Sequence, residues 1–283
     1  MLILNQETLR KLQETELEIL LEVDRICRKN RIHYSLTGGT LLGAVRHGGF
    51  IPWDDDADIS MLRSEYKKFQ QACRTDLDTE KFYFQDMENT PGYRWGYGKV
   101  RRKDSVFLRE GQEEMPYEQG IFLDVFPRDG IPDGRIARKI HAFLCFTVRK
   151  IMWSAIGRKT AHGRIHRWMY QCLYLTTQKK YRKIYQWLQR MSNAKKTTYV
   201  RTLTFPLPNH IKGYRRKWYQ KYTTIQFEGH DFQVQASYEQ WLSREFGDYR
   251  KLPPVEERKT HPVTQIRFPG QLQESTDPIT VQG

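Results

Sequence analysis

The sequence predicts an α/β (α+β) fold with a basic, mainly helical insertion. Strand and helix patterns alternate over about the first 134 residues, and a long stretch with helical spacing and many basic residues follows. A hydrophobic content of 39% with 13% aromatic residues is typical of a globular protein rather than a disordered one. The length of 283 residues suits one large domain, or a domain with an elaboration.

The first predicted elements are a helix, a strand, a glycine turn, a second helix and a second strand. Residues 6–29 carry apolar side chains at helical spacing with charged side chains opposite, which predicts one long amphipathic helix. IHYSLTGGT reads as a short strand entering a glycine turn, and TLLGAVRH as a short helix after it. DADISML is the next strand, and SEYKKFQQAC is a helix with Ser64 as its N-cap.

The later segments complete this pattern. KFYFQDM, RWGYGKVRR and SVFLRE are predicted to be strands of one sheet, and GIFLDVFPRDGIPDG a buried strand that ends in a turn. SYEQWLSREFG is a further helix with Ser237 as its cap. We expect a core over residues 1–134, the basic helical insertion over 135–222, a segment packing back on the core over 223–269, and a flexible tail over 270–283.

The positive charge is concentrated in the middle of the chain. From Arg135 to Phe227 there are 22 Lys and Arg residues and no Asp or Glu, whereas the rest of the chain holds 25 basic and 33 acidic residues. This distribution favours an anionic partner for the central region, and the charge alone fits a phosphorylated glycan, an anionic membrane leaflet or a nucleic acid.

The sequence favours a cytoplasmic protein. It has no apolar run of about 18 residues that would span a membrane, and its start lacks the basic region of a secretory signal. The four cysteines are far apart and form no CxxC, which suits reduced thiols.

A cluster of carboxylates occurs in WDDDADIS. Alternation along a strand places Asp56 and Asp58 on one face and the apolar Ala57, Ile59 and Met61 on the other. Two carboxylates held together share a proton or bind a cation, and Mg²⁺ prefers such oxygen ligands. The pair therefore predicts a metal site of the kind used in phosphate transfer.

A third carboxylate, Asp124, lies between apolar residues in IFLDVF. A charge in a buried strand is costly unless it is paired or bound to a metal, so we expect Asp124 to share the site of Asp56 and Asp58. Asp54 and Asp55 are expected to support the site or cap its loop. The alternative is that WDDDAD is a solvated acidic turn and Asp124 a strand-end cap.

Gly38 and Gly39 follow one predicted strand and precede a helix, where they let the backbone approach an anionic group closely. The order of strand, Gly-Gly, helix, Asp-x-Asp strand and distant single-Asp strand resembles the nucleotidyltransferase fold. That resemblance implies a mixed sheet flanked by helices. It also implies acids that hold Mg²⁺ around nucleotide phosphates, with the third acid helping to deprotonate the attacking hydroxyl.

GGTLLGAVRHGGFIPWDDDADI is similar to the signature of the LicD family, phosphocholine transferases that decorate bacterial surface glycans. The similarity continues in YGKVRRKDSVF, in GIFLDVFPRDGIP and in FEGHDFQV and YEQWLSREFGDYRKLPPVEERKTHPV. It implies transfer of phosphocholine from CDP-choline to a hydroxyl of a teichoic acid or lipopolysaccharide precursor, with Mg²⁺ or alternatively Mn²⁺. Asp56, Asp58 and Asp124 would be both the metal ligands and the catalytic residues.

The resemblance also suggests residues that bind the donor: Gly38, Gly39, Thr40, Arg46, Lys99, Arg101, Trp95 and Tyr97. Lys99 and Arg101 would reach the diphosphate, and Arg46 a phosphate or the acceptor. The plainer interpretation is that basic side chains on an exposed strand are simply solvated.

Choline is a quaternary ammonium, which aromatic cages hold through cation–π contacts. Trp95 and Tyr97, together with Trp53 and Tyr93, are candidates for such a cage, although aromatic residues more often belong to a core. His261 is expected either to close over the site or to be an ordinary loop histidine.

The expected partners are CDP-choline and an anionic or lipid-linked glycan, with peripheral contact to the inner face of the cell membrane and no nucleic acid. One alternative keeps the fold and changes the phosphoalcohol, for example to ribitol phosphate, as in the related fukutin proteins. The other is a nucleic-acid-binding protein with a degenerate nucleotidyltransferase core, which predicts salt-sensitive RNA or DNA binding.

Overall fold

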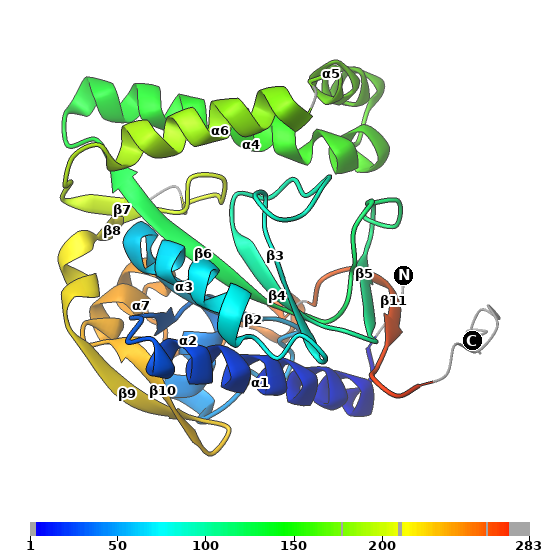
Figure 1. Ribbon diagram of the computed structural model, residues 1–283, viewed down its shortest axis with the longest axis vertical. Helices are drawn as coiled ribbons and strands as arrows, with labels where there is room; N and C mark the ends of the chain where they lie inside the picture. Colours follow the sequence, from blue (N-terminus) through cyan, green and yellow to red (C-terminus); the bar gives the residue numbers. More distant parts are fainter. Residues whose placement is uncertain (1–3, 177, 209–210, 259, 272–283) are drawn as a thin grey trace.

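The computed structural model describes residues 4–176, 178–208, 211–258 and 260–271, and shows a mixed α/β fold with helices around a central sheet (Figure 1). The helices of this part are α1 Gln6–Lys29, α2 Gly38–His47, α3 Arg63–Asp76, α4 Arg135–Thr160, α5 Arg164–Tyr174, α6 Gln178–Asn193 and α7 Tyr238–Phe246. The strands are β1 Ser35–Leu36, β2 Ala57–Leu62, β3 Phe82–Gln85, β4 Gly98–Arg102, β5 Val106–Arg109, β6 Phe122–Ile131, β7 Tyr199–Arg201, β8 Tyr214–Arg215, β9 Tyr222–Phe227, β10 His230–Gln235 and β11 Val263–Arg267. The predicted tail falls almost wholly outside the described residues.

The central sheet has the order β1-β2-β6-β4-β3, and β7 and β8 extend it beside β6. Strands β2 and β6 are parallel, whereas β1 pairs with β2, and β4 with β6, in antiparallel fashion. Because of this register, Asp58 on β2 and Lys99 on β4 both lie opposite Asp124 on β6. The middle of the sheet thus brings three charged side chains from distant segments together.

Some sequence expectations at this level are wrong. Helix α3 begins at Arg63 with Leu62 as its N-cap, so Ser64 lies inside the helix. Gly38 is the first residue of α2 rather than part of a preceding turn. Strand β5 does not join the central sheet, because it pairs with β11 in a separate two-stranded sheet. Ser237 is the N-cap of α7, as predicted, although its side chain makes no capping hydrogen bond.

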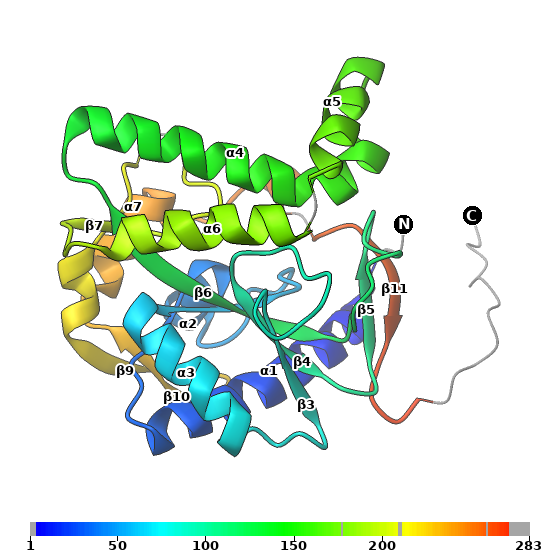
Figure 2. The ribbon, with the colours of Figure 1, turned by 45° about the horizontal axis from the view of Figure 1, so that its top comes forward.

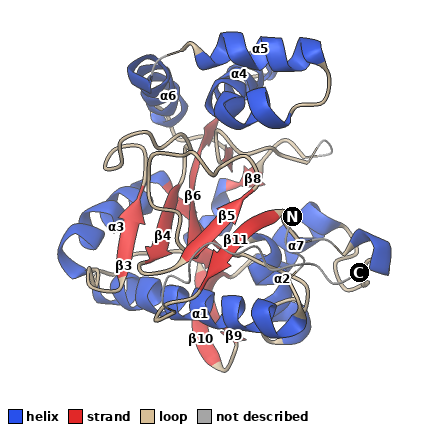
Figure 3. Cartoon of the chain, turned by 90° about the vertical axis from the view of Figure 1, so that its right-hand side faces the viewer, coloured by secondary structure: helices blue, strands red, loops and turns tan. Residues whose placement is uncertain are grey.

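Helices α4, α5 and α6 gather at one end of the molecule, and α1 lies at the other (Figures 2 and 3). Helix α1 buries the apolar face that its sequence predicts, with Leu12, Ile19, Leu20 and Val23 fully buried. A second cluster of buried residues, including Trp95, packs the loop before β4 against α4 and α6.

A buried ion pair ties α3 to the sheet. The Arg63 guanidinium donates two hydrogen bonds of 2.7 Å to the Asp129 carboxylate on β6. The Asn193 amide, at the end of α6, donates a further bond of 2.6 Å to the same carboxylate. This network connects the helical layer to the strand that carries Asp124.

Candidate active site

The site is built around the carboxylates of Asp58 and Asp124 on neighbouring parallel strands. The start of α2 is fastened to this point, because the Asp58 backbone N–H donates to the Thr40 hydroxyl at 2.8 Å. The Thr37 N–H in turn donates to the Asp58 carbonyl at 3.1 Å. Helix α2 therefore begins directly beside the Asp58 carboxylate.

The two glycines of α2 make room for carboxylates. Gly38 has a φ of +59°, and a Cβ at this position would lie 2.9 Å from Asp58 Oδ2. A Cβ on Gly39 would lie 2.2 Å from Asp54 Oδ2. The backbone therefore approaches anionic groups closely at this point. These groups are the carboxylates of Asp58 and Asp54.

Lys99 is the cation nearest to Asp124. Its ammonium donates to the Asp124 carboxylate, and both side chains are buried. The ammonium also lies 3.3 Å from the centre of the Phe122 ring. Burial lowers the pKa of Lys99 to about 7, against the opposing effect of Asp124. Burial raises the pKa of Asp124, and Lys99 opposes that rise.

The residues present fit a divalent cation. Asp58 Oδ1 is buried and has no hydrogen-bond partner among the described residues. Burial, followed by the charges of Asp56 and Asp124, raises the pKa of Asp58 well above its ordinary value. A cation bound between the Asp58 and Asp124 carboxylates would be a partner for Asp58 Oδ1 and would lower the pKa of Asp58.

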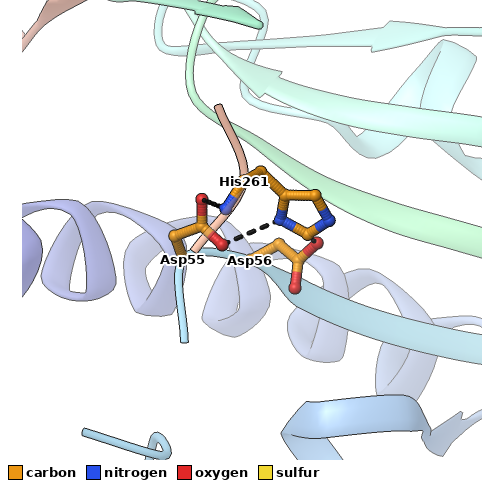
Figure 4. Close-up of side chains that lie close together, drawn as sticks. All are labelled: Asp55, Asp56 and His261. Atoms are coloured by element: carbon orange, nitrogen blue, oxygen red, sulfur yellow. Dashed lines mark hydrogen bonds and ion pairs between the residues drawn. The ribbon is translucent and has the colours of Figure 1, made fainter. Parts of the chain in front are cut away.

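A second group lies next to the first and joins Asp55 and Asp56 to His261 (Figure 4). Asp55 accepts from the His261 backbone N–H at 3.0 Å, and its other oxygen lies 2.8 Å from the ring Nδ1. The same Nδ1 is 3.7 Å from Asp56 Oδ2. One ligand atom from each residue lies within 4.8 Å of the others, so these three side chains form a candidate metal site.

The small sheet of β5 and β11 brings this second group together. His261 lies just before β11, and Arg109 ends β5. Arg109 Nη2 donates to Asp56 Oδ2 at 3.1 Å and lies 3.2 Å from His261 Nδ1. A segment more than 150 positions away in the chain thus closes one side of the acidic cluster.

Two of the predicted donor-binding cations are engaged elsewhere. Arg101 is 2% exposed and donates to the Gln85 side chain and to the Gly120 carbonyl, both at 2.7 Å. Arg46 reaches the carbonyl oxygens of Tyr249 and Lys251 at 3.4 Å. Their roles in donor binding remain predictions.

The predicted aromatic residues do not form one cage. Tyr93 is fully buried, and the Arg258 guanidinium lies 4.5 Å from the centre of a Trp53 ring. Trp95 and Tyr97 precede β4 rather than lie in it, and their rings stack 6.4 Å apart beside a cavity of about 380 Å³. Whether any of them binds choline stays a prediction.

Three charged residues of the site were missed from the sequence: Arg109, Arg128 and Glu16. Arg128 donates to the Thr37 hydroxyl at 2.9 Å and lines a cavity of about 60 Å³ with Gly38 and Asp58. Glu16 is buried on α1, and burial raises its pKa well above the ordinary value, with Asp56 adding to the rise. Glu16 lies one helical turn after the apolar Leu12 and therefore on the same helix face. This position is the signal from which a buried Glu16 could have been predicted.

Fold and site together define a nucleotidyltransferase domain. Residues 31–128 match the family described as the LicD/FKTN/FKRP nucleotidyltransferase domain. The chain is 31% identical over 267 residues to the lipopolysaccharide cholinephosphotransferase LicD of Haemophilus influenzae, covering 91% of this chain and 97% of that protein. It is 36% identical over 100 residues to human ribitol 5-phosphate transferase FKRP, covering 35% of this chain and 18% of FKRP. The chain belongs to the LicD family and is an enzyme, a transferase of the LicD type.

Proposed function

We propose that this enzyme transfers phosphocholine from CDP-choline to a hydroxyl of a bacterial surface glycan precursor, of the lipopolysaccharide or teichoic acid type, in a Mg²⁺-dependent reaction. One observation carries the proposal. Asp58 Oδ1 is buried without a hydrogen-bond partner among the described residues, and Asp58 lies opposite Asp124 in the sheet, beside the start of α2. The similarity to a lipopolysaccharide cholinephosphotransferase over nearly the whole chain supports the choice of phosphoalcohol and acceptor.

The residues of the site suit the transfer step. The glycan hydroxyl oxygen attacks the phosphorus that carries choline, the bond to the bridging oxygen breaks, and CMP leaves with the bonding electrons. We propose that Asp124 accepts the hydroxyl proton. Lys99, which donates to Asp124, and Arg128, which lines the cavity with Asp58, would offset negative charge that develops on the phosphates.

Asp56, Asp58 and Asp124 are our proposed metal ligands, and the group of Asp55, Asp56 and His261 is a neighbouring candidate. A bound ion would supply positive charge that offsets the negative charge of the donor phosphates.

A panel of CDP-alcohols tests the function. The purified enzyme should release CMP from CDP-choline when a glycan acceptor and Mg²⁺ are present, and EDTA should stop the release. Failure with CDP-choline would refute the proposal. Preferential use of CDP-ribitol would instead support the ribitol phosphate alternative, for which the similarity to FKRP is the specific observation.

We further propose that the enzyme is cytoplasmic and works at the inner face of the cell membrane. Of the 16 large hydrophobic residues exposed in the described part of the chain, 13 lie between Ile136 and Met191 on α4, α5 and α6 or at the end of α5. The same region contains no acidic residue. Basic helices with exposed apolar residues bind anionic lipid surfaces. No helix among the described residues is long and apolar enough to cross a membrane.

Sedimentation with vesicles tests the membrane contact. Helix α5 exposes 81% of Ile165 and 70% of Trp168, one turn apart. The double variant Ile165→Ser/Trp168→Ser should lose binding to phosphatidylglycerol vesicles, whereas Phe246→Ser/Leu252→Ser, outside these helices, should retain it. Equal binding by both variants would contradict the proposal. Salt-sensitive binding to RNA without CMP release would support the nucleic-acid alternative.

A further inference from the structure

A cavity of about 380 Å³ lies between the loop before β4, helix α4 and the segment after β7. The residues that matter for its chemistry are Trp95, Tyr97, Arg149, Lys150, Trp153 and Phe205. Its size lies within the roughly 300–1,000 Å³ typical of small-molecule sites.

Aromatic rings form its walls. The Trp95 ring centre lies 5.7 Å from that of Trp153, and the Tyr97 ring centre lies 6.2 Å from that of Phe205. Trp153 and Phe205 are 40% and 43% exposed, so two large rings are left open to solvent at the cavity. Flat aromatic faces of this kind pack against the apolar C–H face of a sugar ring.

The charge of the cavity disfavours a choline cage. Arg149 and Lys150 line it, and no described residue that lines it is Asp or Glu. A quaternary ammonium would lie beside two cations with no carboxylate to offset the repulsion. Arg149 and Lys150, whose ammonium also donates to the Tyr170 hydroxyl at 2.8 Å, favour a phosphate.

The cavity borders the carboxylates of the active site. Phe205 and its neighbour Pro206 also line the smaller cavity that contains Gly38, Asp58 and Arg128. On the other side, the Lys99 ammonium lies 5.5 Å from the centre of the Tyr97 ring. A molecule in the cavity is therefore adjacent to the residues that would bind the donor phosphates.

We propose that this cavity is the acceptor subsite and binds a sugar unit of a phosphate-bearing glycan. The sugar ring packs on Trp153 and Phe205, and Arg149 and Lys150 hold the glycan phosphate. The attacking hydroxyl then points toward Asp58 and Asp124. This inference rests on the proposed function for the identity of the acceptor.

Binding of a synthetic trisaccharide with one phosphomonoester, measured by calorimetry without donor, tests the subsite. Phe205→Ala and Trp153→Ala should each raise its Kd about tenfold, as expected for loss of an aromatic anchor. Phe246→Ala is the matched control, because Phe246 is 42% exposed and does not line the cavity; its Kd should equal that of the wild type. The Arg149→Gln/Lys150→Gln variant should lose the preference for the phosphorylated over the dephosphorylated trisaccharide.

A second measurement tests the acceptor subsite independently of the proposed function. Hydrolysis of CDP-choline by water, measured as CMP release without acceptor, should be unchanged in Trp153→Ala, because Trp153 does not line the cavity that contains Asp58. Wild-type Kd values for the trisaccharide in both Phe205→Ala and Trp153→Ala would overturn the proposal, and so would an unchanged Kd with a raised KM for CDP-choline in Trp153→Ala. If the wild type binds the trisaccharide but releases no CMP from any CDP-alcohol, the proposed function fails and the subsite stands.

Discussion

At the scale of single residues, the acidic site depends on a glycine, which has no side chain, as well as on its charged residues. Gly38 has a positive φ, and a Cβ at this position would lie only 2.9 Å from Asp58 Oδ2, so a side chain there would crowd the Asp58 carboxylate. Gly229, in the turn between β9 and β10, has a similar φ of +77°, but a Cβ there would meet nothing within 4 Å. Substituting each of the two glycines therefore distinguishes the effect of backbone strain, common to both, from the effect of crowding at the site, which occurs only at Gly38.

Gly38→Ala and Gly229→Ala should each lower the free energy of unfolding by about 1 kcal/mol, because both residues adopt a left-handed conformation. Only Gly38→Ala should also displace the Asp58 carboxylate and raise the KM for CDP-choline. Urea unfolding and CMP-release kinetics measure the two effects. Equal kinetics in the two variants would show that the close contact at Gly38 is irrelevant to the site.

At the scale of elements, the buried Arg63–Asp129 pair holds α3 and α6 to β6. Replacing Asp129 with Asn leaves the Arg63 charge buried without its counterion, which should lower the free energy of unfolding by ~3–5 kcal/mol. Glu239→Gln is the control, since the Arg250–Glu239 pair has exposed side chains and should contribute less than about 1 kcal/mol. Similar losses in the two variants, measured by urea unfolding, would contradict this account.

Helix α4 makes stability depend on pH through His141. This side chain is 1% exposed, and its Nε2 lies 2.8 Å from the Ser192 hydroxyl on α6. Burial, and then the charge of Arg201, lowers the pKa of His141 from its ordinary 6.5 to about 4. Between these values the unfolded chain takes up a proton that the folded protein does not, so stability falls as the pH drops from about 6.5 toward 4.

His141→Gln can keep a hydrogen bond to Ser192 but cannot titrate. The stability of the wild type relative to His141→Gln should therefore be constant above about pH 6.5 and should decrease below it. Denaturant unfolding at pH 7.5, 6 and 5 provides the comparison. A difference that does not change with pH would mean that His141 is not held neutral.

At the scale of the whole molecule, the residues of the candidate site that belong to short, local sequence patterns could be predicted. Asp56 and Asp58 follow the glycines within about twenty residues, and Asp124 is marked by its apolar neighbours in β6. The long amphipathic pattern of α1 and the helical spacing of α4 to α6 likewise gave elements that the structure contains.

The rest of the site depends on contacts between distant segments. Arg109 meets the acidic cluster only because β5 pairs with β11, and no local sequence pattern indicates that pairing. His261 was a candidate to close over the site, and it contacts the cluster just before β11. The same pairing explains why β5 was wrongly assigned to the central sheet. Asp55 was expected only to support the site or cap its loop, because it lies in the turn before the predicted strand, and its histidine partner is 206 positions away in the chain.

The central claim is that transfer depends on a cation held by the paired carboxylates, and Asp58→Asn tests it most directly. Amide replacement removes a proposed metal ligand and also relieves repulsion with Asp56 and Asp124. CMP release from CDP-choline with Mg²⁺ and acceptor should therefore fall by at least about 100-fold, while the melting temperature stays equal to or above that of the wild type. Wild-type turnover by the folded Asp58→Asn enzyme would contradict the account.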